Sequence, residues 1–344
     1  MDETIKKAMY YTNGVLERLR QQRKLNPELC DMIISVDEQI YRVHKCLMIA
    51  SCDYFDAMAR SGMQETRTDK VELKGVTPQG INEVIDFIYS GELRLSLSNI
   101  ADILRVVSHL QVQHALKLCE EYLIEETTVD NCIEMLNLAD MFCIGTVRTA
   151  VNNFVLRNFD KLIQSEQYKK FTLDQMCFYL QSNKLRLYPE VRVFKACLSW
   201  LKANNNCATK VYDLMQHVRF CTMRPEEFVD IVAKTDVVKS DAKCNELLIE
   251  AYEYFALPNR QYLSSSPRSL IRNEPVTVCV NESMYILNRR EEIWQYLCHS
   301  AASCKTISQK FIVVNNFLYA CGGYSESNRE TSDKCHRFDP CTGM

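Results

Sequence analysis

The sequence predicts an α+β domain at the N-terminus, an all-α domain of stacked helix pairs in the middle, and an incomplete all-β segment at the C-terminal end. Residues 29–93 alternate between strand-like and helical apolar patterns, which indicates the α+β domain. Residues 130–255 have a helical period almost throughout, and no glycine lies between Gly145 and Gly322. Few tight turns with positive φ form without glycine, so this stretch favours helix. Beyond it, β-type runs such as VTVCV and KFIVV appear.

The first domain is expected to open with a β-hairpin. Within residues 29–43, two apolar, β-prone runs flank Asp37 and Glu38, which is typical of two strands joined by a short turn. A helical pattern follows over 44–60, and KVEL at 70–73 predicts a short strand.

The helix that begins near residue 78 has the clearest local signals. Thr77 is a good N-cap, and Pro78 occupies the first helical position. Apolar residues then recur at the spacing of one helix face, and Gly91 supplies the stop. Another helix with one apolar face is expected after Ser98.

The middle domain is predicted to be a series of helices. Asp130 is expected to cap the first of them. The further helical patterns lie near 146–158, 190–203, 209–216, 225–233 and 244–255. Successive helices with short connections predict stacked helix pairs. The composition then changes, because residues 256–275 are rich in proline and serine and indicate a linker.

Charge and hydropathy exclude several classes of partner. The net charge of −3 over 344 residues gives no reason to expect a nucleic-acid or anionic-membrane partner. The N-terminal stretch MDETIKKAMYY is too polar for a signal peptide, and no apolar run is long enough to span a membrane. We therefore expect a cytoplasmic protein, with the nucleus as a second location.

The 17 cysteines do not form a metal-binding pattern, because no C-x-x-C occurs. Without a secretory signal, the thiols are expected to be reduced and mostly buried as small hydrophobic side chains. Whether one of them acts as a redox sensor stays open, since that role depends on a thiol pKa that the sequence does not show.

No enzyme signature is found. The chain has no G-x-S-x-G, no H-E-x-x-H, no phosphate-binding glycine loop and no RING-type array of cysteine and histidine. His109 and His114 are five residues apart, so they lie on different helix faces. We expect no catalytic residue, cofactor or metal.

Five motifs in a fixed order carry a resemblance to a known family. They are LCDMIISVDEQIYRVHKCLMIASCDYF, with Asp31, His44 and Lys45; GVTPQGINEVIDFIYSGEL; VFKACLSWL; HVRFCTM; and LYACGG with RFDP. The chain resembles the BTB–BACK–Kelch, or kelch-like, proteins, which are substrate adaptors of cullin-3 ubiquitin ligases. The resemblance implies a BTB/POZ domain with an N-terminal helix at 1–128, a BACK domain at 129–257, a linker at 258–275, and incomplete kelch repeats at 276–344.

The kelch segment holds about one and a half repeats, since a repeat runs about 50 residues. Its signature residues are Gly322, Gly323, Asp339 and Pro340. In relatives a tryptophan follows the aspartate by six positions, which is one position beyond Met344. A propeller needs four or more blades to close. The chain is therefore expected to end within the kelch domain and to lack most of the surface that recruits the unknown protein substrate.

The resemblance also implies two binding sites in the BTB domain. The family dimerises through this domain, and the apolar candidates in the N-terminal helix are Val15, Leu16 and Leu19. Relatives bind cullin-3 partly through a hydrophobic residue, any residue and a glutamate after the third BTB helix, and Met63, Gln64 and Glu65 fit this pattern.

Two residues depart from the family pattern. Ala59 stands where relatives usually carry phenylalanine, which removes apolar contact area beside the cullin-binding motif. Cys221 replaces a common proline and is expected to affect only a local turn.

Two other classes of protein also contain a BTB domain. A BTB transcription regulator would usually carry zinc fingers, whose ligand pattern does not occur in this sequence. A cullin-independent, kelch-type cytoskeletal scaffold shares the same domains and stays open. The fit of residues 63–65 favours the non-catalytic adaptor.

Overall fold

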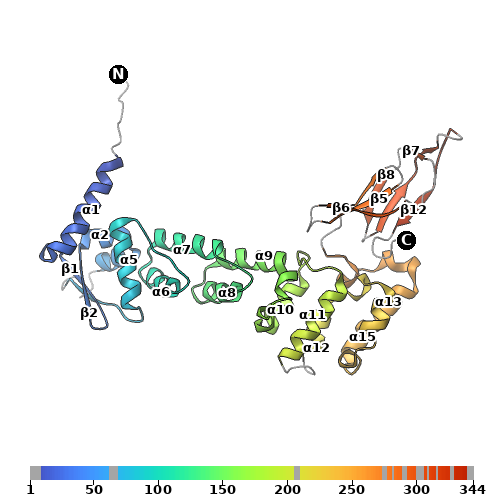
Figure 1. Cartoon of the computed structure of the whole chain (residues 1–344), viewed down its shortest axis with the longest axis horizontal. Helices are drawn as coiled ribbons and strands as arrows, with labels where there is room; N and C mark the ends of the chain where they lie inside the picture. The colour runs from blue at the N-terminus through green and yellow to red at the C-terminus, as the bar shows by residue number, and fades with distance from the viewer. Residues whose placement is uncertain are drawn as a thin grey trace, which may run out of the picture. The chain divides into compact units, whose positions relative to one another are not determined.

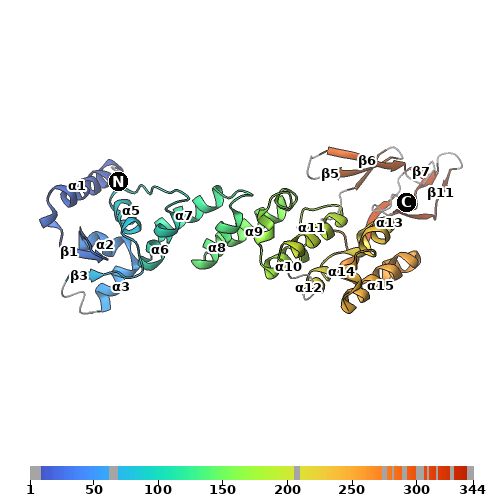
Figure 2. The same ribbon diagram turned by 60° about the horizontal axis from the view of Figure 1, so that its bottom comes forward.

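Figures 1 and 2 show the computed structural model of the chain. It divides into two compact units, Met1–Phe154 and Val155–Met344. The residues described are 9–61, 69–204, 210–272, 277–280, 283–288, 293–299, 306–307, 310–314, 317–325 and 329–338. Each unit is treated separately below.

The first unit contains a three-stranded sheet in the order β2-β1-β3. Strands β1 (Met32–Val36) and β2 (Gln39–Val43) pair antiparallel, with Met32 opposite Val43, and β3 (Lys70–Glu72) runs parallel to β1. The turn between β1 and β2 has Asp37 at a φ of 51°. The expected hairpin and the short strand are therefore confirmed.

Helices pack around this sheet and continue beyond it. In chain order they are α1 (Met9–Leu25), the 3-10 helix η1 (Pro27–Leu29), α2 (Lys45–Ser51), α3 (Asp53–Ser61), α5 (Pro78–Ser90), α6 (Ile100–Leu110), α7 (Gln113–Glu125), α8 (Cys132–Met141) and α9 (Gly145–Leu162), which crosses the unit boundary. The helical pattern over 44–60 forms two helices rather than one, because Cys52 adopts an extended conformation between them.

Helix α5 begins and ends as its sequence predicts. The Thr77 hydroxyl accepts a hydrogen bond from the Gly80 N–H at 3.2 Å, and Gly91 ends the helix with a φ of 74°. Gly80 also allows α5 to approach α6 closely. A Cβ atom at this position would lie 2.6 Å from the Asp102 carbonyl oxygen, which is closer than real Cβ contacts. The helix pair therefore depends on glycine at this point.

The expected cap at Asp130 is wrong. The residue before α8 is Asn131, and no side chain caps this helix. The Asn131 amide oxygen instead accepts a hydrogen bond from the Thr128 N–H at 2.7 Å, while its amide nitrogen donates to the Glu126 carbonyl at 2.8 Å. Both bonds stabilise the turn before the helix rather than the helix itself.

The helical part of the second unit confirms the expected all-α domain. After α9 come η2 (Gln167–Lys170), α10 (Leu173–Gln181), α11 (Glu190–Ala203), α12 (Val211–Met215), η3 (Phe220–Thr222), α13 (Pro225–Glu227), the π-helical turn η4 (Phe228–Val232), α14 (Asp236–Lys239) and α15 (Ala242–Ala256). Trp200 on α11 is buried and donates its indole N–H to the Phe171 carbonyl at 3.1 Å. Phe220 and Phe228 continue the core toward α15.

The segment after α15 lies against the helices. It contains two 3-10 helices, η5 (Pro258–Leu263) and η6 (Pro267–Ser269). Beyond them, the buried Arg272 guanidinium contacts the Glu190 carboxylate at 3.0 Å through both Nε and Nη2. Arg272 also donates to the carbonyls of Leu180, Ser182 and His217. Arg219 contributes a backbone N–H to Glu190 at 2.9 Å. A buried ionic cluster thus fastens this segment to the helical domain.

The C-terminal strands confirm an incomplete β domain. They are β4 (Thr277–Val280), β5 (Ser283–Asn288), β6 (Ile293–His299), β7 (Thr306–Ile307), β8 (Lys310–Val314), β9 (Phe317–Cys321), β10 (Tyr324–Ser325), β11 (Glu330–Thr331) and β12 (Cys335–Phe338). They form three-stranded sheets in the orders β4-β5-β6, β12-β9-β8 and β11-β10-β7. Figure 2 shows β5 and β6 side by side. The sheets formed by these described strands do not close into a propeller.

Candidate functional site

The motif residues of the first unit come together at the start of α2. The Asp31 carboxylate accepts a hydrogen bond from the Lys45 backbone N–H at 2.7 Å. The His44 ring nitrogen Nδ1 lies 2.8 Å from the hydroxyl of Tyr89, which also accepts the His44 N–H at 2.9 Å. Burial raises the pKa of Tyr89 to about 12, so its phenol stays neutral. These residues therefore stabilise the junction between the sheet and the helices.

Helix α3 is firmly anchored on its inner side. Phe55 and Met58, one turn apart, are both buried. At the start of the helix, the Asp53 backbone N–H donates to the Gln111 carbonyl at 3.4 Å, and the Gln113 amide donates to the Asp53 carboxylate at 3.1 Å. These bonds join α3 to the connection between α6 and α7. The outer side of α3 is therefore a rigid surface.

The outer side of α3 carries an aromatic pair. The half-buried Tyr54 ring lies 5.5 Å, centroid to centroid, from the ring of His109, which is exposed near the end of α6. Ala57 and Arg60 on the same helix are also exposed. Tyr54 was not among the residues singled out from sequence, because no local pattern reveals which helix face remains uncovered.

The residues that sequence assigns to cullin binding, Met63, Gln64 and Glu65, lie outside the described residues. The structure does describe what flanks them. Ala59 is half-buried near the end of α3, and the Ser61 hydroxyl donates to the Met58 carbonyl at 2.8 Å. The chain is next described at Asp69, whose carboxylate pairs with the Lys45 ammonium at 2.6 Å. Both flanks of the proposed motif are thus fixed to the same domain.

Helix α1, which carries the predicted dimer residues, lies beside α5 (Figure 1). Arg23 links the two helices through an ion pair with Asp86 at 2.9 Å. Val15 is 40% exposed, whereas Leu16 and Leu19 are half-buried. The structure therefore leaves Val15 the most accessible of the three.

Further exposed apolar side chains lie at the end of α1 and in the chain that follows it. Leu25, Leu29 and Ile40 are 77%, 54% and 67% exposed. Sequence reasoning did not select them, since apolar periodicity alone would assign them to the core. Large apolar side chains on the surface are typical of protein interaction sites when they gather into patches.

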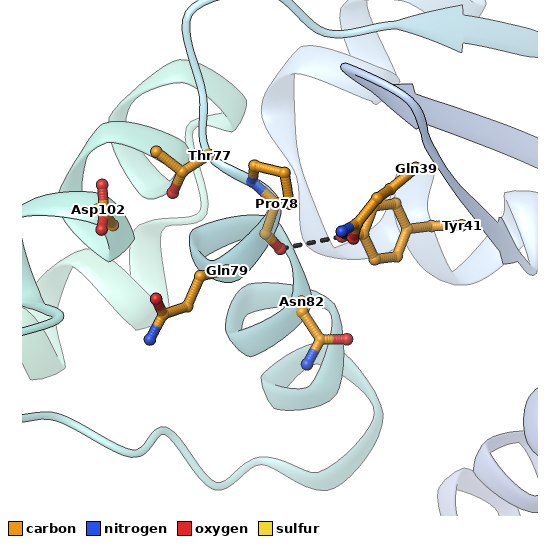
Figure 3. Close-up of a pocket in the computed structure, with 7 residues that line it drawn as sticks. All are labelled: Gln39, Tyr41, Thr77, Pro78, Gln79, Asn82 and Asp102. Carbon is orange, nitrogen blue, oxygen red and sulfur yellow. Dashed lines mark hydrogen bonds between the residues drawn. The ribbon is translucent and has the colours of Figure 1, made fainter.

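A surface pocket of about 600 Å³ lies between β2 and the N-terminal ends of α5 and α6 (Figure 3). Its lining residues are Gln39, Tyr41, Thr77, Pro78, Gln79, Asn82 and Asp102. The Tyr41 hydroxyl donates to the Pro78 carbonyl at 2.9 Å, and burial raises the pKa of this tyrosine. The lining has a single carboxylate, that of Asp102, and contains no cysteine, histidine or serine.

Within the described residues, no group of three histidine, cysteine, aspartate or glutamate side chains could hold a metal ion. None of the described helices is both long and apolar enough to cross a membrane. Of the cysteines whose side chains the structure describes, most are buried. Burial raises the pKa of Cys52 and of Cys119 to about 12, which is the behaviour expected of inert core thiols.

The glycines of the kelch signature lie just after β9. Gly322 and Gly323 have φ values of 68° and 109°, which glycine adopts readily and other residues rarely do. The Gly322 N–H donates to the Lys334 carbonyl at 2.9 Å. The other signature residues, Asp339 and Pro340, lie outside the described residues.

Comparison with known proteins identifies the two larger domains. The family model of the BTB/POZ domain matches residues 19–127, and the model named BTB And C-terminal Kelch, or BACK, matches residues 132–233.

Curated relatives match almost the whole chain. Kelch-like protein 26 of Homo sapiens is 30% identical over 328 residues, which cover 91% of this chain and 53% of the relative. Kelch-like protein 9 of Mus musculus is 31% identical over 335 residues, which cover 93% of this chain and 54% of the relative. The chain thus spans about half the length of the curated relatives it matches.

Solved structures match the first domain at low similarity. The BTB domain of zebrafish PATZ1 is 20% identical with a TM-score of 0.33, and that of human Gigaxonin is 23% identical with a TM-score of 0.32. Each match covers 36% of this chain, and the matches cover 100% and 98% of the two solved chains. The assignment therefore depends on the domain models and the relatives: with a BTB domain followed by a BACK domain, and similarity to kelch-like proteins along nearly its whole length, the chain belongs to the kelch-like family.

Proposed function

We propose that this chain is a substrate-specific adaptor of a cullin-3 RING E3 ubiquitin ligase, without catalytic activity of its own. The observation that carries the proposal is a BTB domain followed directly by a BACK domain, in a chain similar to kelch-like proteins over more than nine-tenths of its length. An adaptor of this kind acts by positioning its substrate. It holds a substrate close to a ubiquitin-charged enzyme, which raises the effective concentration of the reacting groups.

The proposed cullin-docking surface is the outer side of α3 together with the motif that follows it. Its members are Tyr54, Ala57, Arg60, His109, Met63, Gln64 and Glu65. A rigid helix loses little conformational freedom on binding, and aromatic side chains such as Tyr54 often dominate binding energy. Methionine adds adaptable apolar contact, and glutamate offers a charge for pairing at the rim. Ala59 supplies less apolar area than phenylalanine would, which lowers the affinity we expect.

The remaining partners follow from the same proposal. The BTB domain forms a homodimer that uses α1, with Val15, Leu16 and Leu19 at the interface. A protein substrate of unknown identity is recruited by a kelch propeller, of which this chain carries only a part. We place the adaptor in the cytoplasm and also in the nucleus, which fluorescence microscopy of the tagged chain tests.

The test measures binding of the purified chain to the N-terminal region of cullin-3 by calorimetry. Met63→Ala combined with Glu65→Ala is expected to raise the Kd by at least tenfold, and Tyr54→Ala by a similar factor. Lys74→Ala is the matched control, because Lys74 is exposed in the same domain and lies outside the proposed surface. Its Kd should equal that of the wild type.

Two outcomes would contradict different parts of the proposal, the docking surface and the adaptor function. Wild-type affinity in both variants would remove the proposed surface but keep the adaptor. Absence of wild-type binding at high micromolar concentration, with the dimer intact, would instead favour the cullin-independent cytoskeletal scaffold.

A further inference from the structure

Two cysteines face each other across neighbouring strands of the C-terminal region. Strands β9 and β12 pair antiparallel, and the register places Cys321 directly opposite Cys335. The two sulfur atoms are 2.8 Å apart. Among the described cysteines, these two have their sulfur atoms in contact.

The hydrogen-bond pattern shows which kind of cross-strand pair this is. The Gly322 N–H donates to the Lys334 carbonyl at 2.9 Å, which places residues 322 and 334 at a hydrogen-bonded position of the ladder, while the Lys334 N–H donates to the Ser332 hydroxyl at 3.2 Å. Hydrogen-bonded and non-hydrogen-bonded pairs alternate along an antiparallel ladder. Cys321 and Cys335 therefore occupy a non-hydrogen-bonded pair, where Cα atoms are about 4.5 Å apart and side chains lie closer together. A disulfide needs Cα atoms about 4.4–6.8 Å apart, so the backbone already has a compatible spacing.

The pair is also accessible from solvent. Cys335 is exposed and Cys321 is partly exposed, unlike Cys197 and Cys244, which are buried in the helical domain. Solvent access lets a small oxidant reach the thiol and lets a reductant reverse the reaction. Contact between two thiols, correct strand register and solvent access thus coincide at one place.

We propose that Cys321 and Cys335 are a reversible modification site, at which hydrogen peroxide converts the two thiols into a disulfide that joins β9 to β12. The Cys335 thiolate attacks a peroxide oxygen, the O–O bond breaks, and a sulfenic acid forms with release of water after protonation. The Cys321 thiolate then attacks the sulfenic sulfur, the S–S bond forms, and a second water leaves. Two thiols lose two electrons and two protons, and one hydrogen peroxide becomes two waters.

The disulfide would close a loop that contains residues 322–334, including the two signature glycines. In the reduced chain the described antiparallel ladder pairs β12 with β9, and no covalent bond joins these two strands. The disulfide would keep the strands paired. This site does not depend on the proposed cullin function, since it lies outside the BTB and BACK domains.

Peptide mapping of the full chain tests the site directly. Tryptic cleavage after Lys310, Arg329, Lys334 and Arg337 separates the two cysteines onto peptides 311–329 and 335–337. The purified chain is treated with hydrogen peroxide, free thiols are alkylated, and the digest is analysed without reduction. The hydrogen bond to Cys321 raises the pKa of Cys335, which makes its thiolate scarce and its attack slow, so the incubation is extended to hours.

We expect peptides 311–329 and 335–337 to appear as one disulfide-linked species that dithiothreitol separates. Cys335→Ser and Cys321→Ser should each abolish it, whereas Cys143→Ser, which removes an exposed cysteine of the first unit, should leave it unchanged. Recovery of both cysteines as separately alkylated peptides, or as sulfinic acids, would overturn the proposal. A disulfide that joins Cys321 or Cys335 mainly to a third cysteine would also overturn the proposal. The wild-type digest alone decides between these outcomes, so the test does not depend on how the variants fold.

Discussion

Replacing Arg272 by alanine would remove the guanidinium that neutralises a carboxylate inside the helical domain. The side chains of Arg272 and Glu190 are 2% and 4% exposed, so water does not compensate for the loss. Of the hydrogen bonds described for the Glu190 carboxylate, only the one from the Arg219 backbone N–H would remain. Removing one partner of a buried ion pair costs about 3–5 kcal/mol.

The carbonyls of Leu180, Ser182 and His217 would lose a donor as well. These losses are not additive, because the groups belong to one hydrogen-bond network and share the same lost partner. We therefore expect a loss of about 4 kcal/mol in the free energy of unfolding. In a domain of this size each kcal/mol lowers the Tm by about 2–4 °C, which predicts a decrease of about 10 °C.

Thermal unfolding followed by the fluorescence of Trp200 measures this change, since Trp200 is buried in the same domain. The variants are made in a Trp294→Phe background, which leaves Trp200 as the only tryptophan. Lys234→Ala is the matched control. Lys234 and Asp230 form an ion pair in this domain with both side chains 65% exposed, and exposed pairs contribute about 0–1 kcal/mol. If Arg272→Ala lowers the Tm no more than Lys234→Ala does, our account of the buried cluster is refuted.

Two further predictions concern the first unit. Gly80→Ala should lower its stability by about 1–3 kcal/mol, because the new Cβ would meet the Asp102 carbonyl at 2.6 Å and push α5 away from α6. Gly14→Ala in α1, where the Cβ meets nothing within 4 Å, should instead raise stability by about 0.5–1 kcal/mol, and equal effects of the two in chemical denaturation would contradict the packing argument. Val15→Glu with Leu19→Glu should convert the proposed dimer into a monomer in sedimentation velocity, while Arg18→Glu on the exposed side of the same helix should not. A dimer that persists in the double variant would place the interface elsewhere.

The features that were predicted correctly depend on neighbours in sequence. The cap of α5 needs only Thr77, Pro78 and Gly91, whose backbone preferences act within a single helix. A local signal of the same kind precedes α10, where Thr172 and Gln175 form a capping box, although no helix was expected there. The error at Asp130 shows the limit of such signals. Two adjacent residues were both able to cap α8, and hydrogen bonds within the preceding turn occupy the second of them.

The exposed faces could not be predicted, because they depend on which segments cover each helix. Val15, Leu16 and Leu19 look alike in sequence, yet the structure leaves Val15 more exposed than the other two. The partner of Tyr54 is likewise set by the fold, because α6 places His109 beside it from a distant part of the sequence. The family resemblance predicts the order of the domains and the motif at 63–65, whereas the contact between Tyr54 and His109 is evident only from the structure.

The docking of the segment after α15 could not be predicted either, because it depends on residues that are far apart in the sequence. Its proline and serine content indicates a linker, and such composition is typical of chain that buries little apolar surface. Arg272 and Glu190 are 82 residues apart in the sequence, so neither periodicity nor motif spacing predicts their pairing. A single buried charge pair can fasten a polar segment that has few apolar contacts of its own, provided that its remaining donors also find acceptors. Arg272 meets that condition through three backbone carbonyls, and each of them comes from the helical domain rather than from the segment itself.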